Sequence, residues 1–209
     1  MQARVTVRHV PSAEPHPIRL ANTVRRDRST VRDHLATAAD LAAWLSGNDV
    51  GADAGTPVAA GAVAAEDVTA TDLAAFRELR TAVRDLAAAL TDDTRPIARD
   101  ADVARAVDVV NRAATRADTR PQLEVVDGRL RRTTTTTAGP VAAALAATAA
   151  EAVDLFTGDE RELLRACHAP GCVLYFVKDH PRREWCSTGC GNRVRAARHY
   201  RRTSGVTAR

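Results

Sequence analysis

All four cysteines of this 209-residue chain lie within one stretch of 24 residues. Cys167 and Cys172 form a C-x4-C pair, thirteen residues follow, and Cys186 and Cys190 form a C-x3-C pair. Each pair presents two sulfur atoms from one tight turn, and zinc binds four thiolates in a tetrahedron. The spacing therefore predicts one zinc ion per chain. Because four thiolates leave no position for a reactive water, this zinc would be structural rather than catalytic.

Two disulfides and an iron–sulfur cluster are the alternative uses of four cysteines. The first 17 residues contain three prolines and no apolar core segment, unlike a signal peptide, so we expect an intracellular chain with reduced thiols. Iron–sulfur proteins use the same ligand at other common spacings. Both alternatives stay open at this point, and zinc is favoured.

The residues between and after the cysteine pairs predict the rest of a small module. A β-branched and aromatic run at 173–177 is followed by turn-forming residues at 178–181, and 182–185 leads back towards the second pair. We therefore expect a β-hairpin flanked by the ligands. Residues 192–202 are rich in alanine and arginine and lack proline and glycine, which favours a helix starting at the last ligand. These elements describe a treble-clef-like finger.

Two motifs resemble a known family. Trp-Cys-Ser at 185–187, followed by Cys-Gly-Asn-Arg at 190–193 and a basic helix, resembles the CGNR zinc-finger family, which takes its name from that tetrapeptide. Leu-Ala-Asn-Thr-Val at 20–24 and Trp-Leu at 44–45 resemble the ABATE domain that precedes this finger in the family. The resemblance covers nearly the whole chain, and its C-terminal motif is the more specific of the two.

The resemblance implies a bacterial two-part protein that acts as a stress-related transcription regulator and binds DNA through its finger. It supplies a fold more directly than a function, because the DNA-binding role in the family rests largely on basic charge. This chain also departs from many members, which have a Ser-Arg-Asn-like turn in the hairpin. Here the turn at 178–181 reads Lys-Asp-His-Pro, so a base-reading role does not carry over to it.

Charge is divided unevenly along the chain. Residues 165–209 carry ten Lys or Arg and two Asp or Glu, a formal charge of +8, whereas residues 1–164 carry 20 and 24, a formal charge of −4. A zinc ion with four thiolates subtracts two charges and leaves the finger strongly basic. The finger therefore faces a polyanion, or, in the alternative reading, docks on the acidic N-terminal domain.

The arginines after the last cysteine separate by helix geometry, at 100° per residue. We expect Arg193 to face inward with Ala197 and Tyr200, where its guanidinium offsets the charge of the thiolates, and Asn192 to donate to a sulfur. Arg195, Arg198 and Arg202 form an outward stripe and are the first predicted nucleic-acid contacts. The other basic residues predicted to contact nucleic acid are Arg201, Arg182, Arg183 and Lys178.

The rest of the chain predicts a mainly α fold. Aromatic residues make up only 3%, so the core must consist of Leu, Val and Ala, which suits closely packed helices. We place an N-terminal tail at 1–17, an ABATE-like helical domain with one β-hairpin at 18–160, the finger at 161–205 and a tail at 206–209. The expected helices are the end of a short one at 20–24, an amphipathic one at 31–45, a long one at 69–90, one at 103–110 after Asp100 or Asp102, and one from Pro140 to Phe156.

Loops and turns complete this prediction. Residues 51–65 are rich in Gly and Ala and predict a flexible loop. Asp-Gly at 127–128, between β-branched runs at 122–126 and 129–135, predicts a hairpin with a two-residue turn. Along the helix from Pro140 we expect Val141, Leu145, Val153 and Phe156 to share one face, and Asp159 to cap a short helix that carries Leu163 and Leu164 into the finger.

Several classes of function are not expected. No nucleophile elbow, phosphate-binding glycine loop or spaced histidine set is present, so we do not expect an enzyme. No run of 18 apolar residues is present, so we expect no membrane span and a cytoplasmic location. The Asn22-Thr23 pair, flanked by aliphatic residues, could line a small-molecule effector site, or it could be a helix cap bonded to backbone.

Two functions compete. The first is a DNA-binding regulator whose helical domain senses an effector or forms a homodimer; duplex DNA is the favoured partner. The second is an RNA-binding or protein-interaction module in which zinc only stabilises the fold. Four of the seven aromatic residues, Tyr175, Phe176, Trp185 and Tyr200, lie in the finger. If exposed beside arginines they would favour stacking on single-stranded RNA, and if buried they are the core of a small module, which is the favoured reading.

Overall fold

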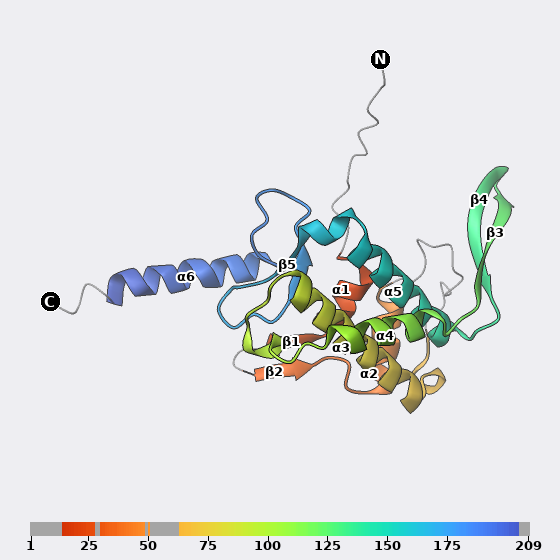
Figure 1. Ribbon diagram of the computed structural model, residues 1–209, viewed down its shortest axis with the longest axis horizontal. Helices are drawn as coiled ribbons and strands as arrows, with labels where there is room; N and C mark the ends of the chain where they lie inside the picture. The colour runs from red at the N-terminus through yellow and green to blue at the C-terminus, as the bar shows by residue number, and fades with distance from the viewer. Residues whose placement is uncertain (1–13, 28–29, 49, 51–62, 205–209) are drawn as a thin grey trace, which may run out of the picture.

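The computed structural model describes residues 14–27, 30–48, 50 and 63–204 (Figure 1). In these residues the fold is mainly α with a C-terminal finger, as the sequence predicts. It has three separate two-stranded antiparallel hairpins, two of them in the helical domain, where the sequence predicted one. The helices are α1 (His16–Ala21), α2 (Ala38–Ser46), α3 (Ala70–Leu90), α4 (Val103–Ala114), α5 (Pro140–Thr157) and α6 (Thr188–Ser204), with 3-10 helices at Ala65–Asp67, Pro96–Ala98 and Asp159–Leu163. The strands are β1 (Val24–Asp27), β2 (Thr30–Asp33), β3 (Thr119–Val126), β4 (Arg129–Thr136), β5 (Leu164–Ala166) and β6 (Tyr175–Val177).

The long helix α3 is the centre of the helical domain. It contacts α1, α2, α4 and α5, and it buries Phe76, Leu79 and Val83 completely. Its start is the predicted capping box: the Asp72 N–H donates to Thr69 Oγ1 at 3.1 Å, and the Thr69 N–H donates to Asp72 Oδ2 at 3.0 Å. The two bonds satisfy backbone donors that a helix N-terminus leaves free.

Helices α4 and α5 pack against each other and against α3. Asp102 caps α4 by accepting the Arg105 N–H at 3.0 Å. It is one of the two residues, Asp100 and Asp102, that the sequence offered for this cap. The predicted face of α5 is correct for Val141 and Leu145, which are buried, but wrong for Val153, which is exposed. Val153 lies about 120° around the helix from Val141, so it points away from the core.

Helix α5 is long and apolar enough, by length and composition, to cross a membrane. Half of it is buried inside the fold, where it packs against α1, α3 and α4. It is made largely of alanine, and these small side chains let the neighbouring helices approach closely. These contacts describe the core helix of a folded domain.

The N-terminal region differs from the prediction. The expected helix over 31–45 is a strand, β2, followed by a loop and the shorter helix α2, which begins where Thr37 and Asp40 form a second capping box. Val24 likewise begins β1 rather than ending a helix. The first helix already starts at His16, inside the segment expected as a tail. Tertiary contacts of Asp33, described below, explain why β2 ends there. Most of the loop predicted at 51–65 lies outside the described residues.

The hairpin of β3 and β4 is confirmed, with slightly longer strands than expected. Asp127 (φ 52°) and Gly128 (φ 72°) form its two-residue turn in the left-handed region that such turns need. The hairpin projects from the helical body (Figure 1). Leu123, Val125 and Leu130 share one of its faces and are 66%, 70% and 70% exposed.

Candidate metal centre and nucleic-acid interface

The first cysteine pair is held by a short hairpin. β5 and β6 pair antiparallel, with Ala166 opposite Tyr175. Cys167 follows β5 directly, and its N–H donates to the Leu174 carbonyl at 2.9 Å. The Cys172 N–H donates to the carbonyl three residues earlier, also at 2.9 Å. The hairpin therefore closes a knuckle that presents both thiols on one side.

This hairpin is not the one that the sequence predicted. The run at 173–177 pairs with β5, which precedes the first cysteine, rather than with 182–185. Instead of a return strand, the side chain of Arg183 donates to the Val177 carbonyl at 2.9 Å. Leu164, expected in a short helix, begins β5, and the cap of the preceding 3-10 helix is Gly158 rather than Asp159.

The second cysteine pair lies at the start of α6. Cys186 precedes the helix and Cys190 lies in its first turn. Ser187 Oγ accepts the Cys190 N–H at 3.2 Å, and the Ser187 carbonyl accepts the Gly191 N–H at 3.2 Å. A Cβ at Gly191 would lie 3.3 Å from the Trp185 ring, so glycine lets this ring pack closely against the helix. The serine fixes the turn from which both thiols project.

The four sulfur atoms converge on one point. The Sγ atoms of Cys172 and Cys186 are 3.8 Å apart, those of Cys186 and Cys190 3.3 Å, those of Cys190 and Cys172 3.7 Å, and all four with Cys167 lie within 4.8 Å of one another. Zn–S bonds of about 2.3 Å place tetrahedral sulfurs roughly 3.8 Å apart. A disulfide needs about 2.05 Å, and all four thiols are free. The geometry confirms the predicted four-cysteine site for one zinc ion.

Charge at the site also favours a cation. Four thiolates so close together repel one another, and a dication removes that repulsion. Arg193 adds a second positive group: its Nη2 donates to Cys190 Sγ at 2.9 Å. Asn192 is placed differently from the expectation, because its amide oxygen is exposed and accepts from Arg195 rather than its amide donating to a sulfur.

The interior of the finger is aromatic and aliphatic. Phe176 and Val194 are buried beside the cysteines, and Trp185 packs against them. The guanidinium carbon of Arg183 lies 5.1 Å from the centre of the Phe176 ring, and Arg183 also forms an ion pair with Glu14. The sequence assigned Arg183 to nucleic acid, but the structure uses it to hold the finger together.

The other predicted nucleic-acid residues remain at the surface. Arg182 is exposed and Lys178 is half-buried. On α6, Cys190, Gly191 and Val194 are buried, and the residues after Val194 are exposed or half-buried. The exposed arginines after Val194 are Arg195, Arg198, Arg201 and Arg202. Arg193, expected to face inward, is also an exposed residue, although its guanidinium reaches Cys190. Tyr200 was expected to face inward, but it is 71% exposed because α6 extends away from the body at that point (Figure 1).

The finger is attached to the helical domain through Tyr175. The side-chain amide of Asn22 donates to the Tyr175 carbonyl at 2.8 Å, and the Asn22 amide oxygen accepts the Tyr175 N–H at 3.0 Å. The phenol donates to Asp93 Oδ2 at 2.8 Å. Burial, with this bond to Asp93, raises the pKa of Tyr175 to about 12. Asn22 thus acts as a one-residue strand partner for β6.

Arg95 holds the knuckle backbone from the same side. It pairs with the fully buried carboxylate of Asp93 at 2.6 Å, and its Nη1 donates to the carbonyls of Cys167, Cys172 and Leu174 at 3.1–3.2 Å. Burial alone would raise the pKa of Asp93, but the bonds from Arg95 and Tyr175 hold it below its ordinary value. The two metal ligands of the knuckle are therefore positioned by residues of the helical domain.

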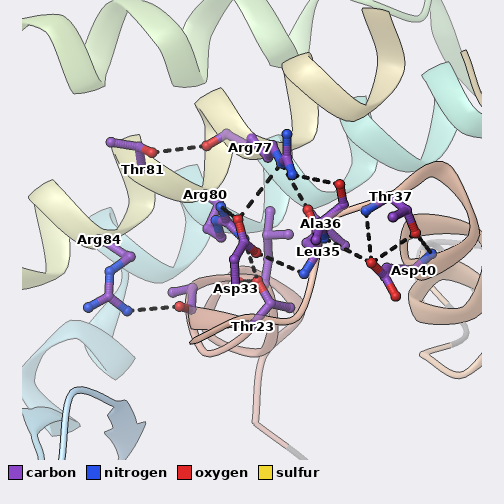
Figure 2. Close-up of polar contacts among 12 residues, drawn as sticks. Thr23, Asp33, Leu35, Ala36, Thr37, Asp40, Arg77, Arg80, Thr81 and Arg84 are labelled. Carbon is purple, nitrogen blue, oxygen red and sulfur yellow. Dashed lines mark hydrogen bonds and ion pairs between the residues drawn. The ribbon is translucent and has the colours of Figure 1, made fainter. Parts of the chain in front are cut away.

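A row of arginines on α3 connects this junction to the N-terminal hairpin (Figure 2). Arg84 donates to the Ala21 carbonyl at 2.9 Å and to the Val173 carbonyl of the finger at 3.1 Å. Buried Arg80 binds Asp33 through both terminal nitrogens. Arg77, one turn earlier, donates to the carbonyls of Leu35 and Ala36 in the loop after β2, both at 2.8 Å. These bonds end β2 at Asp33 and fix the loop before α2.

Asn22 and Thr23 therefore have protein partners. Asn22 binds Tyr175, as described, and Thr23 Oγ1 donates to the Leu20 carbonyl at 2.7 Å and accepts from Arg80 at 3.2 Å. Of the two readings of this pair, the one in which its side chains bond to backbone describes the structure. The sequence did not predict that the Asn22 bonds would reach the finger.

The residues that join the two parts were not found from the sequence. Glu14, Arg84, Asp93 and Arg95 contact the finger across more than 70 residues of chain. Their spacing carries no long-range signal. The only local sign is the Asp-Thr-Arg stretch at 93–95, in which the carboxylate binds the arginine two residues later.

The arrangement defines a class of protein: a helical domain fused to a four-cysteine zinc finger with a projecting basic helix. Family models match both parts: residues 15–159 match ABATE, described as "Putative stress-induced transcription regulator", and residues 164–203 match the CGNR zinc finger. A comparison with curated proteins gave no match. The chain belongs to the ABATE family and carries a C-terminal CGNR zinc finger, as its resemblance implied.

Proposed function

We propose that this protein is a transcription regulator that binds duplex DNA through α6 of its finger. The observation that carries the proposal is the composition and position of this helix. Residues 188–204 contain five arginines and no acidic residue. All five are exposed, and the four that follow Val194 lie on a helix that stands clear of the body (Figure 1). An unopposed row of guanidinium groups on a free helix suits the phosphates of a nucleic acid.

Salt dependence tests the proposal. Arg195, Arg198 and Arg202 are replaced together by glutamine, and affinity for a duplex is measured by fluorescence anisotropy at several salt concentrations. Each lost phosphate contact reduces the slope of log affinity against log salt by about 0.9. The matched control replaces exposed Arg116, Arg129 and Arg131, which removes the same charge from the helical domain and leaves the apolar face of the β3–β4 hairpin unchanged. If both triple variants keep the original slope, α6 is not the DNA-binding element.

A second candidate is binding of single-stranded RNA. The observation that favours it is Tyr200, which is 71% exposed between arginines and offers a ring on which a base can stack. Tyr200→Ala separates the two candidates, because it weakens RNA binding about tenfold if the ring stacks on a base and leaves duplex binding unchanged. Tyr175 and Phe176, in contrast, are buried in the core.

We also propose a homodimer formed through the hairpin of β3 and β4. An isolated two-stranded hairpin is marginally stable in water, and the apolar face of Leu123, Val125 and Leu130 would be covered in a dimer. Sedimentation velocity of a Leu123→Lys, Leu130→Lys variant tests this, with a monomer as the expected result. The helical domain would then supply both dimerisation and effector sensing to the finger.

Two further properties are part of this proposal. We propose that the protein is not an enzyme, because a zinc ion with four thiolate ligands has no position for a reactive water. A cytoplasmic location follows from a chromosomal DNA partner and from thiols that need a reducing compartment to bind zinc. Protein purified without chelator is expected to contain one zinc ion per chain.

A further inference from the structure

A cleft lies at the junction of the helical domain and the zinc knuckle. It has a volume of about 590 Å³, within the usual range for small-molecule sites. Its walls come from three separate segments: the β1–β2 hairpin, the 3-10 helix at Pro96–Ala98, and knuckle residues 168–173. Apolar side chains of Val31, Ile97 and Pro170 line it, and the first two are about 40% exposed.

The charged groups that line the cleft are cationic. They are Arg26 and Arg95, and none of the described lining residues is acidic. Arg95 is already bonded to Asp93 and three carbonyls, so it serves as a wall. Arg26 lies across the knuckle, where a Cβ at Gly171 would be 3.0 Å from its Cδ. A guanidinium has five N–H donors, so Arg26 can bind a carboxylate while it keeps a contact within the protein.

We propose that this cleft binds a small carboxylate with an apolar body, the anion at Arg26 and the body against Ile97 and Val31. Apolar walls with a few convergent polar groups are the usual composition of a ligand site. An aromatic carboxylate of 10 to 15 non-hydrogen atoms, on the order of 200 to 300 Å³, fits within this volume. Asn22 and Thr23, whose side chains bond within the protein, are not needed for this site.

A ligand in this cleft would touch both parts of the protein at once. The knuckle wall includes Cys172, one of the four metal ligands, and Arg95 holds the carbonyls of Cys167 and Cys172 from another wall of the cleft. Binding there stabilises the arrangement in which finger and helical domain are closed on each other. That the ligand then changes nucleic-acid binding rests on the proposed function, whereas binding itself does not.

The probe is indole-3-acetate, and its matched counterpart is tryptamine, which has the same indole body and the opposite charge. Titration calorimetry on the full zinc-loaded chain is expected to give one site for indole-3-acetate and none for tryptamine. Amide NMR shifts are expected at 168–173 and at Ile97. Binding of both probes alike, or of neither, overturns the proposal.

Paired variants locate the site. Ile97→Asp places a carboxylate in the wall and is expected to weaken binding on the order of tenfold, the effect of one repulsive charge at close range. Its control is Val107→Asp on α4, because Val107 and Ile97 are 43% and 41% exposed. Arg26→Gln is expected to weaken binding similarly, with the adjacent exposed Arg25→Gln as control. Equal affinity in a cleft variant and its control overturns the site.

Folding and function are separated by two further readouts. Zinc content and thermal unfolding are measured for every variant to identify any that misfold. If a cleft variant misfolds, Val31→Asp, in the wall formed by the β1–β2 hairpin, takes its place. Duplex binding is then measured with and without indole-3-acetate. A probe that binds the cleft but leaves DNA affinity unchanged contradicts the regulatory step alone, and a protein that binds no nucleic acid contradicts the proposed function while leaving the ligand site intact.

Discussion

At the scale of single residues, Arg193 connects the basic helix to the metal. Its Nη2 lies 2.9 Å from Cys190 Sγ, while the remaining arginines of α6 point to solvent. A cation hydrogen-bonded to a thiolate lowers the negative charge that the zinc site carries. The arginine in the family's tetrapeptide therefore contributes to metal binding, and the arginines after it are available to a partner.

Arg193→Ala is expected to weaken zinc affinity about tenfold, the lower end of the effect seen when a group bonded to a metal ligand is removed. Competition with a chromophoric zinc chelator measures it. Arg198→Ala is the matched control, since it removes an exposed arginine of the same helix. Equal zinc affinity in the two variants would contradict the role of Arg193.

A partly buried histidine, His16, is expected to make stability depend on pH. His16 Nδ1 lies 2.7 Å from Glu151 Oε2 and His16 Nε2 lies 2.6 Å from the Asn48 carbonyl, so both ring nitrogens face acceptors. The ring must carry two protons to donate to both. Chiefly because of the hydrogen bond to Glu151, the pKa of His16 is raised above its ordinary value.

The sign of the pH effect follows. A group with a raised pKa stabilises the fold fully below its unfolded value, about 6.5, and this contribution is lost as the pH rises through the folded value. We expect the melting temperature of the native chain to fall over that range more than that of His16→Gln. Thermal unfolding between about pH 6 and pH 9 measures the difference. His199→Gln, on the exposed face of α6, should behave like the native chain; a parallel fall in all three proteins would exclude the assignment.

Residue types and spacing predicted the metal site but not its surroundings. Four cysteines in two short pairs can close on one ion with little help from the rest of the chain, so local spacing was sufficient. The placement of Arg183 and Asn22 was not predictable, because their partners lie 169 and 153 residues away in the sequence. Only the folded chain brings such groups together.

At the scale of elements, Asn22 lets a helix end act as a strand. Its amide pairs with both backbone groups of Tyr175, the residue at the start of β6. The hairpin of β5 and β6 is only three residues long on each side, so this extra pairing extends it. The bond also links the loop after α1 to the metal knuckle.

Asn22→Ala is expected to lower the free energy of unfolding by roughly 2–4 kcal/mol, because it leaves two buried backbone groups of Tyr175 without partners. Urea unfolding followed by circular dichroism measures the change. The control is Asn192→Ala, which removes an exposed amide bonded only to Arg195 and should cost less than about 0.5 kcal/mol. Similar losses in the two variants would mean that the amide of Asn22 contributes little.

The helices were easier to predict than the hairpins. Helix caps, apolar periodicity and a proline at a helix start are local signals, and they placed α3, α4 and the start of α5 correctly. The strands β1, β2 and β5 are three or four residues long and lack a period that a sequence could display. β2 pairs with β1 and ends at Asp33, which Arg80 of α3 binds, and β5 pairs with β6. Tertiary contacts decided these elements.

At the scale of the whole molecule, the finger and the helical domain share one set of interactions. Tyr175 and Val177 lie in a core cluster with Ile18, Ala87 and Leu155 of the helical domain. Arg84 and Arg95 add hydrogen bonds from the same domain to the knuckle. Metal binding and folding are coupled in small zinc modules, so we expect zinc to stabilise the helical domain as well as the finger.

Removal of zinc tests this coupling through tryptophan fluorescence. The chain has two tryptophans, Trp44 in the helical domain and Trp185 in the finger, so a Trp185→Phe variant leaves Trp44 as the only reporter. The Trp44 ring packs edge-on against Phe76 of α3, with ring centres 6.0 Å apart, so its emission reports on the helical core.

With a strong chelator, we expect the thermal unfolding transition seen by Trp44 to shift to lower temperature and to be restored by added zinc. In an Asn22→Ala, Arg84→Gln background the shift should shrink, because fewer bonds transmit the loss. An unchanged Trp44 transition after complete zinc removal would show that the two parts fold independently.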